Sequence, residues 1–285
     1  MKVLITGNKG FVGKATEAYF KDKGHEVVGF DLSNKQDITD WESFSEFLDD
    51  HKPDVVLHEA AIAQFSEADK NPRLAYEVNV QGTDNVSQSC NYYDIPLVYA
   101  STGSVYMPVT EIPITEESPV RGNSVYGCSK ATAEQYVVES GARYMLLRYA
   151  HLYGKEKIGH GLIGGYLAKI QQGEQPQLMG GDQTNDFTYI DDICEANLFA
   201  CEAILDENME KSWNQAYNIG TGTELTAKDA GDYICSAVGW KGGVKIMPVR
   251  EADPKRFAYN VDKAEKLLGF KAKVDFKEGM EKMLG

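Results

Sequence analysis

The stretch KVLITGNKGFVGK occupies residues 2–14 and joins a short apolar run to a glycine-rich turn. The run is typical of a β-strand, and the residues after the turn are typical of a helix. Gly7 permits a tight turn, Gly10 lets a diphosphate approach the backbone, and Gly13 allows close packing of helix and sheet. This strand–turn–helix context predicts the first βα unit of a dinucleotide-binding fold.

Short β-rich runs alternate with helical patterns through the first half of the chain, which is typical of parallel βαβ units. We therefore expect an α/β fold with a doubly wound parallel sheet, the Rossmann fold, and a smaller C-terminal substrate-binding lobe. Residues 1–153 are expected to be mainly the Rossmann domain and residues 154–285 mainly the lobe, with chain crossing back to the sheet. The expected strands are 2–6, 26–31, 54–60, 96–101 and 144–150, and the expected helices include 41–51, 73–93 and 124–141.

The composition narrows the class of protein. The chain has 285 residues, 42% of them hydrophobic, and a formal net charge of −14. That charge argues against general binding to nucleic acid or to an anionic membrane. Five scattered cysteines form no CxxC pair and no zinc-like spacing, so we expect no metal site and reduced thiols. With no signal peptide and no apolar run long enough to span a bilayer, the pattern predicts a soluble cytoplasmic enzyme or binding protein.

Asp31 stands at the end of the second expected strand, where a carboxylate can accept both hydroxyls of an adenosine ribose and repel a 2′-phosphate. This position favours NAD over NADP. The alternative is that Asp31 only caps a turn, and Lys9 within the glycine loop could favour a phosphate. Asp37 could bond the adenine edge or form a simple Asx turn.

Tyr126 and Lys130 are four residues apart on an expected helix, so their side chains share one face. We expect the Lys130 ammonium to lower the pKa of Tyr126 and make the phenol a usable general base or acid. A hydroxyl of Ser101, Thr102 or Ser104, at the end of the expected strand 96–101, can bond the substrate hydroxyl that Tyr126 deprotonates. The alternative is an ordinary pair on a helix surface.

With these residues in view, the sequence resembles the extended short-chain dehydrogenase/reductases, and within them the NAD-dependent epimerase/dehydratase family of sugar-nucleotide enzymes. The resemblance covers nearly the whole chain in the family's order. Its segments are TGNKGFVG, DVVLHEAA, NVQGTDNV, VYASTGSVY, YGCSK, RYAHLYG, DFTYIDDI, YNIGTG, PVREADPKRF and DKAEKLLGF.

The resemblance implies a Thr102, Tyr126 and Lys130 triad, with Lys130 also holding the nicotinamide ribose. Tyr126 would take a proton from a sugar hydroxyl while hydride passes to NAD, and an epimerase would return the hydride to the other face of the keto sugar. The cofactor-binding residues implied are Gly7, Gly10, Phe11, Val12, Gly13, Asp31, Asp37, Ile38, Ala60, Ala61, Asn79, Tyr126 and Lys130. The substrate-binding residues implied are Thr102, Ser104, His151, Asn185, Arg250 and Asp253.

Two positions depart from the family pattern on the substrate side. His151 stands where the family usually has asparagine, and Asn185 stands where an arginine normally grips the diphosphate. A nearby Lys155, Lys157 or His160 could supply the missing charge. Arg250 matches a diphosphate-binding arginine, and its planar fork suits a bidentate phosphate contact; the alternative for it is a solvated surface arginine.

The residues after Thr102 bear on the reaction. Dehydratases of the family carry an acidic pair there and related decarboxylases a glutamate, whereas this chain has Gly103 and Ser104. The resemblance therefore favours a UDP-sugar 4-epimerase that acts through a transient 4-keto sugar. An NAD(P)H-dependent sugar-nucleotide ketoreductase and a non-catalytic NAD(H)-sensing protein are the alternatives. The family also implies a homodimer formed by the helices at 73–93 and 124–141, with ordinary surface there as the alternative.

Overall fold

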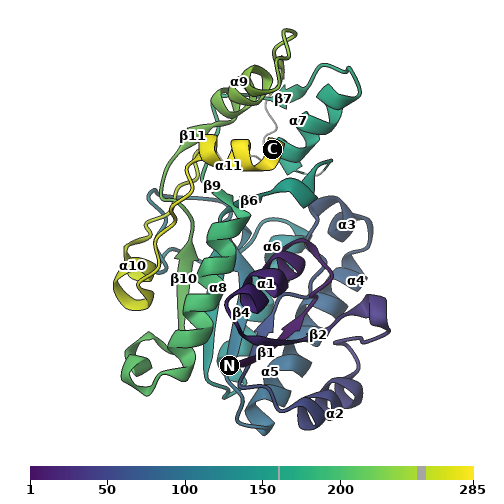
Figure 1. Ribbon diagram of the computed structural model, residues 1–285, viewed down its shortest axis with the longest axis vertical. Helices are drawn as coiled ribbons and strands as arrows, with labels where there is room; N and C mark the ends of the chain where they lie inside the picture. Colours follow the sequence, from purple (N-terminus) through teal and green to yellow (C-terminus); the bar gives the residue numbers. More distant parts are fainter. Residues whose placement is uncertain (160, 249–254) are drawn as a thin grey trace.

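The computed structural model describes residues 1–159, 161–248 and 255–285. Its centre is a sheet of six parallel strands in the order β2-β1-β3-β4-β5-β10 (Figure 1). This arrangement confirms the expected doubly wound α/β fold. The strands are β1 (Lys2–Thr6), β2 (Glu26–Phe30), β3 (Val55–His58), β4 (Leu97–Thr102), β5 (Tyr144–Tyr149) and β10 (Gln215–Ile219).

Helices cover both faces of the sheet, which is why its central strands are continuous apolar runs. Val3, Leu4 and Ile5 of β1 are completely buried. One face packs against α1 (Phe11–Asp22) and α8 (Ile190–Leu205). The other packs against α2 (Trp41–His51), α5 (Thr83–Tyr92) and α6 (Val125–Glu139).

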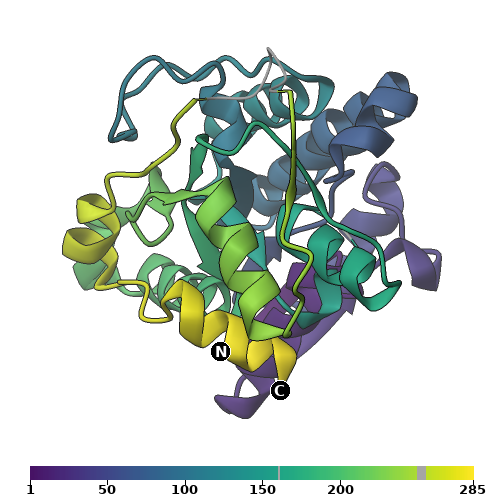
Figure 2. The same cartoon turned by 90° about the horizontal axis from the view of Figure 1, so that it is seen from above.

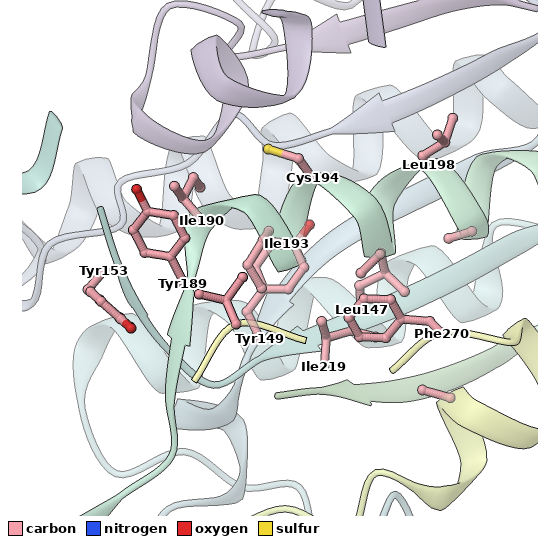
Figure 3. Packing of buried hydrophobic residues seen from close by; sticks show 14 of the residues in the cluster. Leu147, Tyr149, Tyr153, Tyr189, Ile190, Ile193, Cys194, Leu198, Ile219 and Phe270 are labelled. Atoms are coloured by element: carbon pink, nitrogen blue, oxygen red, sulfur yellow. The ribbon is translucent and has the colours of Figure 1, made fainter. Parts of the chain in front are cut away.

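Helix α8 packs its apolar side chains against one face of the sheet. Figure 3 shows Ile193 and Leu198 of α8 in the same cluster as Leu147 and Tyr149 of β5. Because Ile193 and Leu147 are both fully buried, this contact fixes a helix from the second half of the chain onto the sheet.

The long helix expected at 73–93 is not one regular α-helix. It consists of α4 (Pro72–Tyr76), a π-helical segment (Glu77–Gly82) and α5. Buried Asn79 lies in the π-helical segment, and its side chain bonds to the backbone of Ile62 and to Ser129. A π segment inside a helix often marks a functional site, because it redirects the side chains that follow. The short helix α3 (Phe65–Lys70) precedes it.

A smaller lobe lies over the carboxyl ends of the sheet strands, as Figures 1 and 2 show from two directions. In the part of the lobe that the structure describes there are three two-stranded pairs, β6 with β9, β7 with β12 and β8 with β11, besides three helices. Its elements are β6 (His151–Tyr153), α7 (Gly161–Gln171), β7 (Gln177–Met179), β8 (Thr184–Asn185), β9 (Phe187–Tyr189), β11 (Leu225–Thr226), α9 (Ala227–Ala237), β12 (Lys245–Met247) and α11 (Phe276–Leu284).

The chain returns to the sheet twice after it has entered the lobe. Helix α8 and strand β10 do so first, and α10 (Asp262–Leu268) then packs beside β10 (Figure 1). The sheet layer is thus completed by residues that lie beyond position 189.

No helix within residues 1–159, 161–248 and 255–285 combines the length and hydropathy needed to cross a bilayer. The same residues contain no group of three or more His, Cys, Asp or Glu side chains arranged to hold a metal ion. All five cysteines are free thiols.

Candidate active site

A cavity of about 390 Å³ opens where the carboxyl ends of β1, β3, β4 and β5 meet the lobe. In doubly wound sheets, ligands bind in this crevice. The expected site residues in its wall are Gly7, Gly10, Phe11, Val12, Gly13, Ala61, Thr102, Ser104, Tyr126, Lys130 and His151. Asp31, Asp37, Ile38, Ala60, Asn79 and Asn185 are not part of the wall, and Arg250, Asp253 and His160 lie outside the described residues.

Two glycines of the loop, Gly7 and Gly13, have no room for a side chain. Gly7 has φ +71°, and a Cβ there would lie 2.8 Å from the Ala60 backbone. A Cβ on Gly13 would lie 2.3 Å from the carbonyl oxygen of Gly7. The first turn of α1 begins at Phe11 with its N–H groups beside the cavity, where the helix dipole favours an anion. This cradle fits the diphosphate of NAD.

Asp31 lies at the carboxyl end of β2, beside the glycine loop. Its carboxylate accepts hydrogen bonds from the N–H groups of Ser33, at 2.8 Å, and Lys9, at 3.0 Å. Burial raises the pKa of Asp31, but these two groups outweigh it and the pKa is lowered overall. The Lys9 ammonium pairs with Glu17 at 3.5 Å. Asp31 therefore caps a turn and also presents a charged carboxylate at the position suited to a ribose.

Asp37 and Ile38 follow in the loop after β2. The Asp37 carboxylate accepts hydrogen bonds from the N–H and the hydroxyl of Thr39, at 2.9 and 2.8 Å, so the Asx turn is present. Ile38 is 5% exposed, and its carbonyl accepts a hydrogen bond from Asn85.

Asn79 acts on the site through the backbone rather than by facing the cavity. Its side chain accepts from the Ile62 N–H at 2.8 Å and donates to the Ser129 hydroxyl at 3.0 Å. Ser129 in turn donates to the carbonyl of Tyr126. Asn79 thereby joins the loop after β3 to the helix that carries Tyr126 and Lys130.

Two hydroxyls at the end of β4 have different surroundings. Ser101 is buried and donates a hydrogen bond to Glu134. Thr102 caps the turn that follows β4, accepting from the Ser104 N–H at 3.2 Å, and both of these residues reach the cavity. Ser101 also lines the cavity, but its hydroxyl is held by Glu134, whereas the Thr102 hydroxyl bonds to Ser104 and Tyr126 within the site. Thr102 is therefore the hydroxyl best placed to meet a substrate.

Lys130 is 2% exposed and lies one helical turn from Tyr126. Its ammonium donates to the Ala100 carbonyl at 2.7 Å and lies 4.0 Å from the centre of the Tyr99 ring. Burial lowers the pKa of Lys130 to about 7, with Glu134 opposing that shift.

The pKa of Tyr126 differs from the sequence expectation. Burial raises it to about 12, and the hydrogen bond with Thr102 acts in the opposite direction. Lys130 does not lower it, because its ammonium is directed to Ala100 and Tyr99 instead. The phenol is therefore neutral, and it lies in the cavity wall with the Phe65 ring packed edge-on at 5.3 Å.

On the lobe side, His151 lies in the cavity wall between the rings of Phe187 and Phe257. The side chain of His151 is exposed to the cavity, and the surrounding wall and the Lys157 ammonium lower its pKa below the ordinary value, so the imidazole is neutral. Asn185 lies in β8, paired with β11 and outside the wall.

Several residues of the cavity wall, among them Glu59, Glu67 and Glu156, were not predicted from the sequence, and Lys157 was one of three alternatives. Lys157 lines the cavity with its ammonium 5.4 Å from the Phe11 ring, whereas Lys155 is exposed and outside the wall. Glu59 lines the cavity at the end of β3 and was not singled out. A charged residue directly after the apolar run of β3 was the signal that could have found it.

The comparisons with known proteins agree with this geometry. Residues 3–220 match the model of the NAD dependent epimerase/dehydratase family. The chain belongs to this family. A Methanocaldococcus jannaschii protein provisionally named UDP-glucose 4-epimerase is 30% identical over 306 residues, which cover 99% of this chain and 97% of that protein.

Two solved structures of UDP-glucose 4-epimerases have a fold similar to that of this chain. The UDP-glucose 4-epimerase of Thermotoga maritima, determined with UDP-glucose, superposes with a TM-score of 0.90 at 26% identity, covering 100% of this chain and 97% of that one. The Thermus thermophilus UDP-glucose 4-epimerase in complex with NAD gives 0.85 at 27% identity, with coverage of 100% and 99%. The cofactor of this epimerase-family enzyme is NAD.

Proposed function

We propose that this protein is a UDP-sugar 4-epimerase that acts through a transient 4-keto sugar. One observation carries the proposal. A single cavity joins a glycine cradle for a dinucleotide to Thr102, Tyr126 and Lys130, and continues to His151 in the lobe. The UDP-glucose 4-epimerases similar to this chain over nearly its full length support the choice of substrate class. In this proposal, residues 1–153 hold mainly NAD and residues 154–285 mainly the sugar nucleotide.

NAD supplies the hydride acceptor and donor when it is bound. Thr102 orients the sugar hydroxyl, and Tyr126, once it has ionised to the phenolate, takes the proton of that hydroxyl and later returns it. Lys130, when protonated, places a positive charge within one helical turn of Tyr126, and it binds the nicotinamide ribose. Asp31 binds the adenosine ribose. These assignments rest on the positions of the residues in the family motifs and around the cavity.

The side chains next to Thr102 support epimerisation over elimination. Gly103 and Ser104 line the cavity there, and neither can act as an acid or base in water elimination across C5 and C6. A Cβ on Gly103 would lie 2.4 Å from the Phe257 ring, so a longer acidic side chain could not be placed without moving it.

The family normally has a phosphate-binding arginine at the position of Asn185. We propose that Lys157 binds the phosphate instead. Among the described residues, it and Lys130 are the lysines of the cavity wall, and burial lowers the pKa of Lys157. A partly desolvated ammonium gains more from an anionic ligand than a solvated one does. Arg250 and Asp253, which the resemblance assigns to the substrate, remain part of the proposal.

The deciding experiment incubates the protein with NAD and UDP-, GDP- or dTDP-hexoses, with products followed by NMR and mass spectrometry. The expected product is an isomer of a UDP-hexose with unchanged mass and without net NADH. The Tyr126→Phe variant should bind NAD as tightly as the wild type but turn over about 10²- to 10⁴-fold more slowly. Turnover that needs stoichiometric NADH would identify a ketoreductase instead, and wild-type turnover by the variant would contradict the mechanism.

We also propose a homodimer built on α5 and α6. Tyr92 on α5 and Tyr136 and Val138 on α6 are exposed, at 75%, 42% and 48%. Exposed large apolar side chains grouped on two packed helices are typical of an interface. Sedimentation equilibrium should give twice the chain mass, and Tyr136→Glu should shift the protein to monomer.

A further inference from the structure

Glu59 is a carboxylic acid placed directly beneath the glycine loop. It follows β3, and a Cβ on Gly7 would lie 3.2 Å from its carbonyl carbon. Its backbone N–H donates to the Thr6 hydroxyl at 3.2 Å, and the residue is part of the cavity lining together with Gly7, Gly10 and Gly13. An acidic side chain so close to a diphosphate cradle is unexpected, because an ionised carboxylate would repel the ligand.

The two carboxyl oxygens of Glu59 have different surroundings. Oε1 accepts hydrogen bonds from Asn197 of α8 at 2.8 Å and from the Thr16 hydroxyl of α1 at 3.3 Å. Oε2 is buried from solvent and has no hydrogen-bond partner within the described protein. A buried polar atom without a partner is costly, so a group that completes its hydrogen bond is expected at the cavity.

The groups around the carboxyl favour its neutral form. Thr16 and Asn197 are its polar neighbours, and no cation is among the groups that set its charge in the described part of the chain. Tyr149 of β5 and Cys194 and Cys201 of α8 also lie near it, and burial holds all three neutral by raising their pKa values. Burial raises the pKa of Glu59 to about 8 despite the two hydrogen bonds, so it carries a proton at neutral pH.

We propose that Glu59 is a cofactor-binding residue whose protonated carboxyl donates a hydrogen bond from Oε2 to an oxygen of the dinucleotide diphosphate. Thr16 and Asn197 donate to Oε1 and so leave the proton on Oε2. Protonation converts a repulsive carboxylate into a donor, and a donor to a charged acceptor forms a strong hydrogen bond. The inference rests on the proposed function only through the dinucleotide and does not depend on the sugar.

The affinity for NAD should therefore depend on pH in a defined direction. The protonated form is the binding form, so affinity is full below a pH of about 8 and falls as the pH rises through that value. Lys130, with a pKa of about 7, titrates in a neighbouring range and faces the same cavity. The test therefore compares variants that all retain Lys130.

The experiment measures the dissociation constants of NAD and of ADP-ribose by calorimetry from pH 6.5 to 9.5. Wild-type affinity should fall about tenfold between pH 8 and pH 9.5. Glu59→Gln should bind within about threefold of wild type at pH 7 and lose this fall, because the amide oxygen faces Thr16 and Asn197 while its NH₂ donates at every pH. Glu59→Leu should bind both ligands about tenfold more weakly at pH 7.

Glu59→Gln is nearly isosteric, so the test can be made with this variant even if Glu59→Leu does not fold. Thermal unfolding without ligand checks that both variants are folded. The inference is overturned where Glu59→Gln keeps the wild-type fall in affinity, or where wild-type affinity is flat from pH 8 to 9.5. Loss for NAD but not for ADP-ribose would also overturn it, since both carry the diphosphate. A protein that binds no NAD at any pH would contradict the proposed function itself.

Discussion

Glu134 and Arg148 form a two-pronged ion pair directly behind the candidate catalytic residues. The Arg148 Nε donates to Glu134 Oε1 at 2.9 Å and its Nη2 to Oε2 at 2.7 Å, and both side chains are less than 8% exposed. Glu134 lies one turn beyond Lys130 on α6 and also accepts from Ser101, the neighbour of Thr102. The pair therefore joins α6, β4 and β5 at the place where Lys130 and Thr102 must be aligned.

Removing one partner should leave a buried charge without compensation. We expect Arg148→Met to lower the free energy of unfolding by about 3–5 kcal/mol, measured by urea denaturation. Arg256→Met is the matched control, because Arg256 makes a similar pair with Glu224 while its side chain is 60% exposed. The control should cost less than about 1 kcal/mol. Equal losses in the free energy of unfolding for the two variants would show that burial does not determine how much the Glu134–Arg148 pair contributes to stability.

Gly13→Ala should disrupt the cofactor cradle. The added Cβ would lie 2.3 Å from the Gly7 carbonyl oxygen and 2.7 Å from Asn8 Cα, and these backbone atoms can give way only if the loop moves. We expect NAD affinity to fall more than tenfold. Gly165→Ala in α7 is the control, since no atom lies within 4 Å of its added Cβ, and it should raise stability by about 0.5–1 kcal/mol. Retained NAD affinity in the Gly13 variant would contradict the cradle.

Asp31→Asn should reduce the preference for NAD over NADP. The Asp31 carboxylate is charged and lies beside the glycine loop, where it would repel a 2′-phosphate. We expect the ratio of the two dissociation constants to shift toward NADP by about tenfold, a Coulomb contribution of about 1.4 kcal/mol. Asp40→Asn, which should keep its role as the N-cap of α2, is the control and should leave the ratio unchanged.

His58 should make the protein sensitive to acid. Its ring bonds to Thr6 at 2.6 Å and to Thr83 at 3.0 Å. Burial, and then the Lys130 ammonium, lower its pKa to about 3. Because His58 takes up a proton less readily in the folded state than in the unfolded state, its stabilising effect is fully present above the unfolded-state pKa of about 6.5. This stability is lost progressively as the pH falls from about 6.5 toward 3.

Urea unfolding between pH 7.5 and pH 4 would measure this loss, at up to about 1.4 kcal/mol per pH unit below 6.5 from His58 alone. His58→Gln has no charge to gain and should flatten that part of the profile, although it lowers stability at pH 7.5. A variant with the wild-type acid slope would assign the sensitivity to other groups.

Local patterns were enough to predict most of the Rossmann part. The helix α2 spans the expected 41–51, because Phe44 and Leu48 repeat on one face and Asp40 caps the N-terminus. The lobe was harder to predict. Helix α7 lies in a stretch that looked irregular because of its glycines, and β7 gains its parallel partner β12 from more than 60 residues later in the chain. Two-residue and three-residue strands carry too little periodicity to be found without their partners.

In the candidate site, too, the local features were predictable from the sequence and the long-range contacts were not. The glycine spacing and the four-residue interval from Tyr126 to Lys130 are local, so the sequence was sufficient to place them on a turn and on one helix face. It could not show that Lys130 contacts Ala100 rather than lowering the pKa of Tyr126, nor that Glu59 meets Asn197, 138 residues away. Burial and charge depend on which distant segments enclose a side chain, and packing of the sheet, α8 and the lobe sets that enclosure.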